Sequence, residues 1–305
     1  MIKNINKIIL IIIFNLSSAY ATEFDLPKKN NQIIGEVQTT RANFSDNTTT
    51  ISSKYNLGLN SIVAANPDTT DNKLSTRDLV IPTAFILPPL PQEGVIINLP
   101  EMRMYYYPKN GGKVLTYPIG IGKAGNTIPI KNSKITWKKV NPSWTPGPDV
   151  RRYNEAQGVH LPKTLPPGPD NPLGPYAIYL NIPTFLIHST VFPESIGRRA
   201  SFGCIRMNET DIKDFFPIIT AGTSVKIINL PNKIGWRNNR LYLEAHPLLE
   251  EHNTKLKTRL KYITAEIEKK LENNKTTIID WPLVAHLLSE PDGVPHEIGV
   301  KISKT

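Results

Sequence analysis

Proline is the residue that most constrains how this chain can fold. The 305 residues include 27 prolines, and hydrophobic residues make up 39% of the sequence. Because proline breaks helices and restricts the loop backbone, this composition favours strands and ordered loops over a helical bundle. The chain is also too long for one small core, so we expect two or three folded units.

The N-terminus has the features of an export signal. Lys3 and Lys7 flank the start of the chain, residues 8–14 are apolar, and Ala19-Tyr20-Ala21 forms a small-x-small cleavage site. The apolar run is too short to span a bilayer, and an uncleaved membrane anchor is the alternative interpretation. We therefore expect residues 1–21 to be a signal peptide, and the remainder to be a soluble periplasmic protein without a transmembrane segment.

The charge of the chain bears on its partners. The formal net charge is +10 at pH 7. A basic balance often indicates nucleic acid, but export argues against that partner. Anionic polymers of the cell envelope fit better, and solubility alone is the other explanation of the charge.

Residues 34–84 are predicted to form a small N-terminal unit. We expect a first strand at 34–37, short helices at 50–55 and 61–67, and a closing strand at 79–82. This order resembles the LysM domain, a βααβ module that binds glycans containing N-acetylglucosamine. The Gly-Asp turn that usually follows the first LysM strand is absent, and a purely structural unit is the alternative.

Residues 94–231 change to short segments with two-residue periodicity, which predicts an all-β core. Residues 109–112, Lys-Asn-Gly-Gly, indicate a hairpin turn. The expected strands span residues 95–99, 102–107, 114–122, 133–139, 176–181, 184–189 and 224–229. Residues 140–175 carry nine prolines and no periodicity. A long loop inside a compact domain is usually functional, so we expect a lid, with a stiff surface excursion as the alternative.

Residues 240–305 are predicted to be an α-rich accessory region without a catalytic role. A charged helix is expected at 250–273, a shorter helix at 281–288, and a closing strand at 294–302. The apolar stripe of the first helix consists of Leu256, Leu260, Ile263, Ile267 and Leu271.

Cys204 is the only cysteine of the chain. In an exported protein a lone cysteine indicates a reactive thiol or intermolecular pairing. His188 ends an apolar segment, and its imidazole is the natural base to take the thiol proton and to hold the resulting ion pair. An inert cysteine and a structural histidine are the alternatives. One cysteine and scattered histidines lack the spacing of zinc sites, so we predict no metal and no cofactor.

Four neighbours are predicted to support this pair. The backbone N–H groups of Gly203 and the cysteine would point at a developing oxyanion, and Ser201 would fix that turn. Arg206 would share the face of the cysteine and bind a substrate carboxylate, with a structural arginine as the alternative. Ser189 would orient the histidine through its side chain or its carbonyl.

The segment from His188 to Met207 resembles the signature of the YkuD-type L,D-transpeptidases, in which a histidine precedes a Gly-Cys pair with Arg or Asn two residues on. Further matches lie at residues 117–122, 142–146 and 168–174. The resemblance is greatest to the periplasmic, ErfK-like branch, and it implies a mainly β fold with a β-sandwich or barrel catalytic domain. Phe202 stands where the family usually has a second histidine.

The resemblance also implies a reaction. The thiolate would attack the meso-diaminopimelate carbonyl of a peptidoglycan tetrapeptide stem and release D-alanine. An amine would then take the acyl group: a lysine of a murein lipoprotein, or a second stem, which gives a 3→3 cross-link. The expected partners are stem peptides and glycan strands. The alternatives are a catalytically inactive wall-binding protein and an L,D-carboxypeptidase that uses water; a zinc peptidase lacks ligands.

Overall fold

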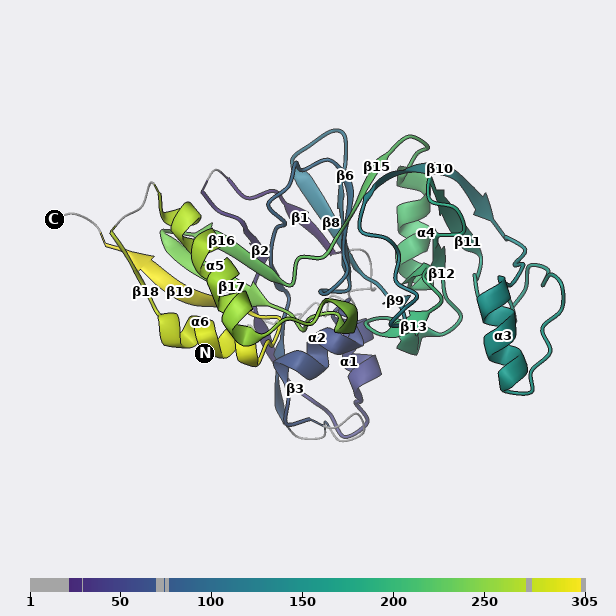
Figure 1. Ribbon diagram of the computed structural model, residues 1–305, viewed down its shortest axis with the longest axis horizontal. Coiled ribbons are helices and arrows are strands. Elements are labelled where there is room, and N and C mark those ends of the chain that lie inside the picture. The colour runs from purple at the N-terminus through teal and green to yellow at the C-terminus, as the bar shows by residue number, and fades with distance from the viewer. Residues whose placement is uncertain (1–21, 29, 70–73, 75–76, 273–275, 303–305) are drawn as a thin grey trace, which may run out of the picture.

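A computed structural model describes residues 22–28, 30–69, 74, 77–272 and 276–302. The predicted signal peptide at residues 1–21 lies outside the described residues. None of the helices in the described part of the chain is long and apolar enough to cross a membrane. The fold is mainly β, as the sequence predicts (Figure 1).

A nine-stranded sheet forms the centre of the molecule, in the order β1-β8-β7-β6-β15-β10-β11-β12-β14. Its strands are β1 (Thr22–Asp25), β6 (Gly94–Asn98), β7 (Arg103–Tyr107), β8 (Lys113–Pro118), β10 (Asn132–Val140), β11 (Tyr176–Leu180), β12 (Leu186–Ser189), β14 (Ile205–Met207) and β15 (Ser224–Ile228). Most of the expected strands of residues 94–231 are thus present. The strand expected at 114–122 is divided into β8 and β9 (Ile121–Gly122), and the two edge strands β1 and β14 were not predicted. Helix α4 (Glu209–Ile218) packs against β11 and β12 on one face of the sheet (Figure 1).

Strand β7 lies between two hydrophobic cores, which explains why its residues are apolar on both faces. Met104 and Tyr106 contribute to the large core on the face of the sheet that α4 covers. Tyr105 and Tyr107 point the other way, into the core that the sheet shares with the N-terminal unit. Successive side chains of a strand alternate between its faces, so one five-residue strand joins the two units.

The N-terminal unit follows the predicted βααβ order, but its first strand differs. Its elements are β2 (Ile33–Gly35), β3 (Gln38–Arg41), α1 (Thr48–Lys54), α2 (Leu59–Ala65), β4 (Asp78–Ile81) and β5 (Ala84–Ile86). Strand β3 pairs with β4, whereas β2 pairs with β5. The strand expected at 34–37 is interrupted at Gly35, whose φ of +68° lies in the left-handed region and ends β2. Membership of the LysM family stays a prediction.

The C-terminal region contains a sheet that the sequence did not predict. Strands β16 (Asn232–Arg237), β17 (Arg240–Ala245), β19 (Pro295–Lys301) and β18 (Thr277–Ile279) form it in that order. Helices α5 (Leu256–Leu271) and α6 (Trp281–Ser289) share its core. The predicted stripe on α5 packs into this core except for Leu256, which is 40% exposed. The expected α-rich region is present, since α5 and α6 together hold more residues than β17, β18 and β19, and the sheet is an addition to it. The sequence did not predict the hairpin of β16 and β17. Its turn is formed by Asn238 and Asn239, both of which have positive φ.

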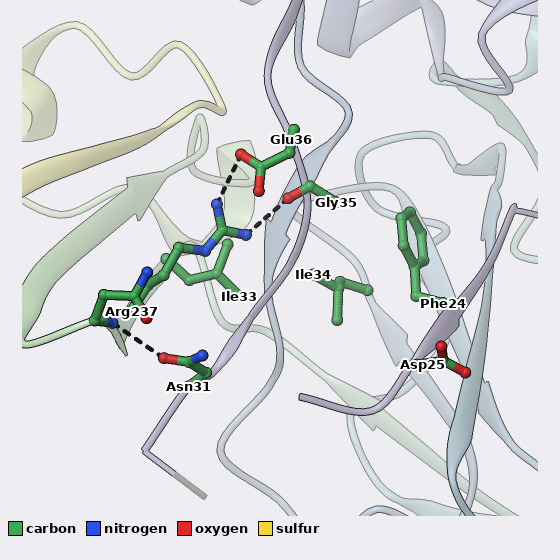
Figure 2. Close-up of a pocket in the computed structure, with 9 residues that line it drawn as sticks. Phe24, Asp25, Asn31, Ile33, Ile34, Gly35, Glu36 and Arg237 are labelled. Atoms are coloured by element: carbon green, nitrogen blue, oxygen red, sulfur yellow. Dashed lines mark hydrogen bonds and ion pairs between the residues drawn. The ribbon is translucent and has the colours of Figure 1, made fainter. Parts of the chain in front are cut away.

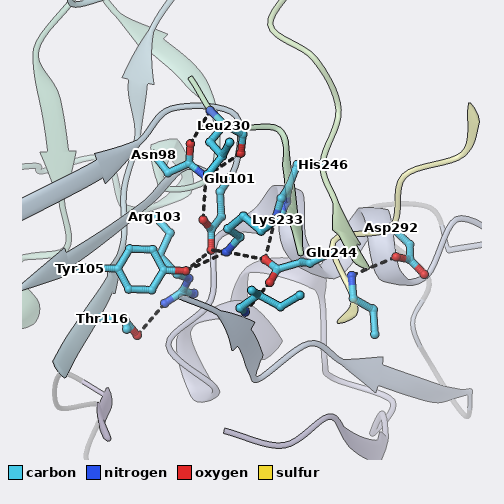
Figure 3. Close-up of polar contacts among 12 residues, drawn as sticks. Asn98, Glu101, Arg103, Tyr105, Thr116, Leu230, Lys233, Glu244, His246 and Asp292 are labelled. Carbon is cyan, nitrogen blue, oxygen red and sulfur yellow. Dashed lines mark hydrogen bonds and ion pairs between the residues drawn. The ribbon is translucent and has the colours of Figure 1, made fainter. Parts of the chain in front are cut away.

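A buried ionic cluster joins the three units (Figure 3). Lys233 Nζ of β16 lies 2.9 Å from Glu101 Oε1 and 2.8 Å from Glu244 Oε1 of β17. The other carboxylate oxygen of Glu244 accepts a hydrogen bond of 2.6 Å from the backbone N–H of Ile86 in β5. We call Glu101, Lys233, Glu244 and His246 the junction cluster. One carboxylate oxygen of each glutamate and a ring nitrogen of His246 lie within 4.8 Å of one another, as in a metal site. Here the Lys233 ammonium group is the cation between the two carboxylates.

A hollow of about 360 Å³ lies at the seam between the N-terminal segment and β16 (Figure 2). Arg237 donates hydrogen bonds of 2.9 Å to Glu36 Oε2 and 2.7 Å to the carbonyl of Gly35. The backbone N–H of Asn238 donates to Asn31 Oδ1 at 3.0 Å. These bonds tie the two chain segments together, and the residues that line the hollow are remote in sequence from Cys204.

The proline-rich loop of residues 140–175, which we call the excursion, is held by its own hydrogen bonds. It carries helix α3 (Pro148–Ala156), which the sequence did not predict. None of the residues of α3 is buried. Arg151 donates to the carbonyls of Leu161, Pro162 and Lys163 at 3.0, 2.8 and 2.8 Å. The buried Asn171 donates to the carbonyls of Pro142 and Pro166 at 2.9 and 3.1 Å. The excursion projects beyond the end of the sheet that carries β11 and β12 (Figure 1).

Candidate active site

Two neighbouring parallel strands place the predicted catalytic residues on one face of the sheet. His188 of β12 pairs with Arg206 of β14, and Ile187 pairs with Ile205. The two isoleucines point into the core beneath α4, so His188 and Arg206 point to the opposite face. Cys204 directly precedes β14 and stands two residues before Arg206, which places its side chain on that same face.

A glycine turn presents the cysteine. Gly203 has a φ of +114°, and a Cβ there would lie 2.5 Å from the ring of Phe185, so only glycine fits. Ser201 Oγ donates a 2.6 Å hydrogen bond to the carbonyl of Cys204 and accepts one of 3.1 Å from the Gly203 N–H. Ser201 thus bonds to both sides of the turn. The Gly203 N–H, which the sequence predicts to be an oxyanion donor, is thus engaged by Ser201.

The thiol of Cys204 is held in its protonated form. Burial raises the pKa of Cys204, while a hydrogen bond from the Leu186 backbone and the charge of Arg206 act in the opposite direction. The Sγ–H group donates to the carbonyl of Thr184 at 3.7 Å. Since the thiolate is the reactive form of a cysteine, this thiol would need a base in order to react.

His188 is buried and neutral. Its Nδ1 lies 2.5 Å from the carbonyl of Ser189, and a carbonyl can only accept, so Nδ1 carries the proton and Nε2 keeps its lone pair. Burial and the charge of Arg206 lower the pKa of His188 to about 4, although the carbonyls of Ser189 and Leu173 oppose that shift. At neutral pH both thiol and imidazole are uncharged. The resting ion pair that the sequence suggested is therefore not favoured in the structure.

Ser189 positions the histidine through its backbone rather than its side chain. Its hydroxyl donates to the carbonyl of Leu173 at 2.8 Å and accepts from the backbone N–H of Tyr176 at 3.0 Å. These bonds fasten the end of the excursion to β12. The carbonyl of Ser189 holds the ring of His188, so of the two predicted routes the structure uses the carbonyl.

Arg206 presents an incompletely paired guanidinium group beside the thiol. Its backbone exchanges two 2.9 Å hydrogen bonds with Gly120. Its Cζ lies 5.8 Å from the centre of the Phe192 ring. Within the described part of the chain, the buried Nε of Arg206 has no hydrogen-bond partner. A guanidinium group with a free donor suits the carboxylate-binding role that the sequence predicted.

Phe202 joins the excursion to the turn at Gly203 and Cys204. Its ring meets the ring of Tyr153 of α3 edge to face at 5.3 Å. Lys123 Nζ lies 4.2 Å from the centre of the Tyr153 ring and 5.1 Å from that of Phe202. The two rings line an open pocket of about 480 Å³ beside the turn, together with Asn126, Asp149 and Arg152. The sequence showed the loss of a histidine at 202 but not this contact, because nothing in the chain pattern pairs residue 202 with residue 153.

Comparison with known proteins decides the family. The YkuD family, described as an L,D-transpeptidase catalytic domain, matches residues 92–227. YcfS of Escherichia coli K12, a probable L,D-transpeptidase, is 38% identical over 240 residues, which cover 76% of this chain and 75% of that protein. The chain belongs to the YkuD family of L,D-transpeptidases.

A second relative agrees with this membership, and one solved structure is also similar in part. The probable L,D-transpeptidase ErfK/SrfK of Escherichia coli K12 is 36% identical over 250 residues, with 79% of each chain covered. The solution structure of the catalytic domain of the Enterococcus faecium L,D-transpeptidase aligns with a TM-score of 0.35 and 21% identity, over 46% of this chain and all of that domain. This YkuD protein is an L,D-transpeptidase enzyme, and its family implies peptidoglycan substrates, as the sequence predicted.

Proposed function

We propose that Cys204 is the nucleophile and His188 the general base of a two-step acyl transfer on peptidoglycan stems. In the first step Nε2 of His188 takes the thiol proton while Sγ attacks the meso-diaminopimelate carbonyl of a tetrapeptide stem. The bond from that carbonyl to the D-alanine nitrogen breaks, and the imidazolium group returns the proton to the departing amine. The products of this step are a thioester on Cys204 and free D-alanine.

In the second step an amine attacks the thioester. The amine loses a proton to His188, an amide bond forms, the C–S bond breaks, and the proton returns to the Cys204 sulfur. A lysine of a murein lipoprotein and the side-chain amine of a second stem are both chemically suitable acceptors. Water in place of the amine would make the protein an L,D-carboxypeptidase.

The placement of His188 and Cys204 on one face of β12 and β14 is the observation that supports this proposal most. The neutral state of both groups also supports it, because a neutral imidazole can accept the thiol proton. Arg206 adds a cation on the same face, where a stem carboxylate would bind. The alternative of an inactive wall-binding protein gives no reason for a buried neutral histidine beside a glycine turn that presents a thiol.

We also propose that the enzyme works in the periplasm, where peptidoglycan and a murein lipoprotein would be its partners. The export features of residues 1–21 support this localisation. The βααβ order of β3, α1, α2 and β4 supports a LysM-like unit that would hold glycan strands near the active site.

Tetrapeptide muropeptides incubated with the enzyme test both steps. D-alanine release is followed by mass spectrometry for the wild type, for Cys204→Ala and for His160→Gln, which changes an exposed histidine of the excursion. We expect release by the wild type and by His160→Gln, and none by Cys204→Ala. Equal release by Cys204→Ala would refute the mechanism. A lysine-terminated peptide or a second stem is then added, and the one that becomes joined to the tripeptide is the acceptor. A free tripeptide stem, joined to neither amine, would indicate an L,D-carboxypeptidase.

A further inference from the structure

Two aromatic rings form an exposed stack on the face of the sheet that carries Cys204. Trp137 of β10 and Tyr179 of β11 lie with ring centres 3.7 Å apart and planes only 6° from parallel. Trp137 is 50% exposed. We call these two residues the aromatic platform. Exposed flat aromatic surface of this kind is typical of binding sites rather than of cores.

The register of the sheet puts the aromatic platform in one row with the thiol. Trp137 pairs with Tyr179, and Tyr179 pairs with Leu186. Leu186 is level with Cys204, because the next residues of the two strands, 187 and 205, are partners. Burial raises the pKa of Tyr179, and the nearby Cys204 adds to that shift. The row therefore runs from the indole of Trp137 on β10, across β11 and β12, to Cys204 at the start of β14.

The length of this row matches the donor substrate. Neighbouring strands lie about 4.8 Å apart, so Tyr179 and Trp137 stand about 10 and about 14 Å from Cys204 along the row. In a stem peptide, three residues connect the attacked carbonyl to the sugar ring. Three extended residues span about 10 Å. A stem that lies along the row with its carbonyl at Sγ therefore brings its sugar over the rings.

The charge of the neighbouring row fits the same orientation. Lys139, Ala177, His188 and Arg206 are successive partners across the sheet, and alternation places them on the face of Cys204. Lys139 is exposed. The two rows contain two positively charged residues, Lys139 and Arg206, and no acidic residue. A stem peptide carries free carboxylates between its sugar and its third residue, so its charge complements this face.

We propose that the aromatic platform binds the N-acetylated sugar ring that carries the donor stem peptide. The apolar C–H face of a pyranose ring packs flat against an indole or phenol ring, and one such contact fixes position with little loss of side-chain entropy. The inference rests on the proposed function, since it takes Cys204 as the point of attack. It makes Trp137 and Tyr179 specificity residues for stems that are attached to glycan.

The test compares two donors that differ only in the sugar. One is a disaccharide tetrapeptide, and the other is the same tetrapeptide with an acetylated N-terminus and no sugar. For the wild type we expect a KM about two- to tenfold lower for the disaccharide donor, the range that one aromatic contact gives. Trp137→Ala should raise the KM for the disaccharide donor by that factor, and Trp137→Tyr should restore most of the preference. Trp281→Ala, which removes a similarly exposed tryptophan at the start of α6, should keep the wild-type preference.

Two results would overturn the inference. The wild type could show equal KM values for the two donors, or Trp137→Ala could raise both KM values by the same factor, which would mean that the rings contact the peptide. If the wild type releases D-alanine from neither donor, the proposed reaction itself fails. Binding then decides on the aromatic platform alone: the Cys204→Ala protein should bind the disaccharide donor more tightly than the acetylated tetrapeptide, and equal affinities would refute the sugar site.

Discussion

The junction cluster and the candidate active site both bury ionisable groups, but they treat charge in opposite ways. In the junction cluster, burial alone would raise the pKa of Glu101, but Lys233, His246, the Tyr105 hydroxyl and Arg103 together outweigh burial, and the pKa is lowered. In the active site burial prevails: it raises the pKa of Cys204 and lowers that of His188 to about 4.

This difference separates a structural role from a chemical one. Buried charges that are fully paired hold two segments in one arrangement, and removal of one partner leaves the other uncompensated. Buried groups kept neutral can exchange a proton as soon as a substrate supplies the reacting atom, so perturbed pKa values of this kind are typical of active sites. Substitutions in the two places should therefore fail differently, one in stability and the other in rate.

Replacing the nucleophile should have the largest effect. Cys204→Ala should lower D-alanine release by about 10⁴-fold or more, because the reaction loses its covalent intermediate. Thermal unfolding should change little, since the hydrogen bond from Sγ to the Thr184 carbonyl is long, at 3.7 Å. A variant that unfolds far below the wild type would contradict the assignment of a purely chemical role.

Replacing the base should be the next most severe change. His188→Gln should slow acylation by about 10²- to 10⁴-fold, the usual contribution of a general base. In the wild type the base is active while neutral, so kcat/KM should stay level across neutral pH and fall only as the pH drops through about 4. Stopped-flow acylation between pH 3.5 and 8 measures this limb. A fall of kcat/KM near pH 6.5 would indicate an ordinary exposed histidine. The contrast between the active site and the junction cluster would then be wrong.

Removing the central cation of the junction cluster should cost stability. Lys233→Met leaves two buried carboxylates without their partner and should lower the free energy of unfolding by about 3–5 kcal/mol. Lys226→Met is the matched control, because Lys226 pairs with the exposed Glu93 at 3.0 Å, and such pairs contribute at most about 1 kcal/mol. Urea unfolding measures both. Equal losses would mean that the junction cluster does not brace the three units.

The pH dependence of stability should reveal the same cluster. Because the pKa of Glu101 is lowered on folding, its pairing stabilises the wild type above the ordinary glutamate pKa, and that contribution is lost as the pH falls through the folded value. Chemical denaturation from pH 7 down to pH 3 should show this loss in the wild type. A Glu101→Gln variant should show a flatter profile over the same range, and an unchanged slope would count against the pairing.

The contact between Phe202 and Tyr153 should give the smallest effect. Each ring replaced by alanine should destabilise the docking of α3, with a coupling of about 0.5–1.5 kcal/mol in a double-mutant cycle. Hydrogen exchange of residues 148–156 reports the docking, and it should speed up in Phe202→Ala. Exchange that stays at the wild-type rate would show that the excursion is held without this ring pair.

Much of the fold could be predicted because the two-residue periodicity of strands is visible in the sequence. The two faces of β7 and the apolar end of β12 are visible as patterns, and Cys204 and His188 stand out by their chemistry. The rest depends on distant partners. Lys233 and Glu101 are ordinary charged residues until β16 meets the turn between β6 and β7. The row from Trp137 to Cys204 exists only in the register of four strands. The neutral state of His188 follows from burial, which the sequence does not show.

The decisive measurement is the mass of the peptide that contains Cys204 after the wild type has been mixed with a tetrapeptide stem and quenched in acid. The mechanism predicts an adduct equal to the stem without its D-alanine, located on Cys204 by fragmentation and formed in step with D-alanine release. Release of D-alanine without any adduct on Cys204, or with the adduct on another residue, would contradict it.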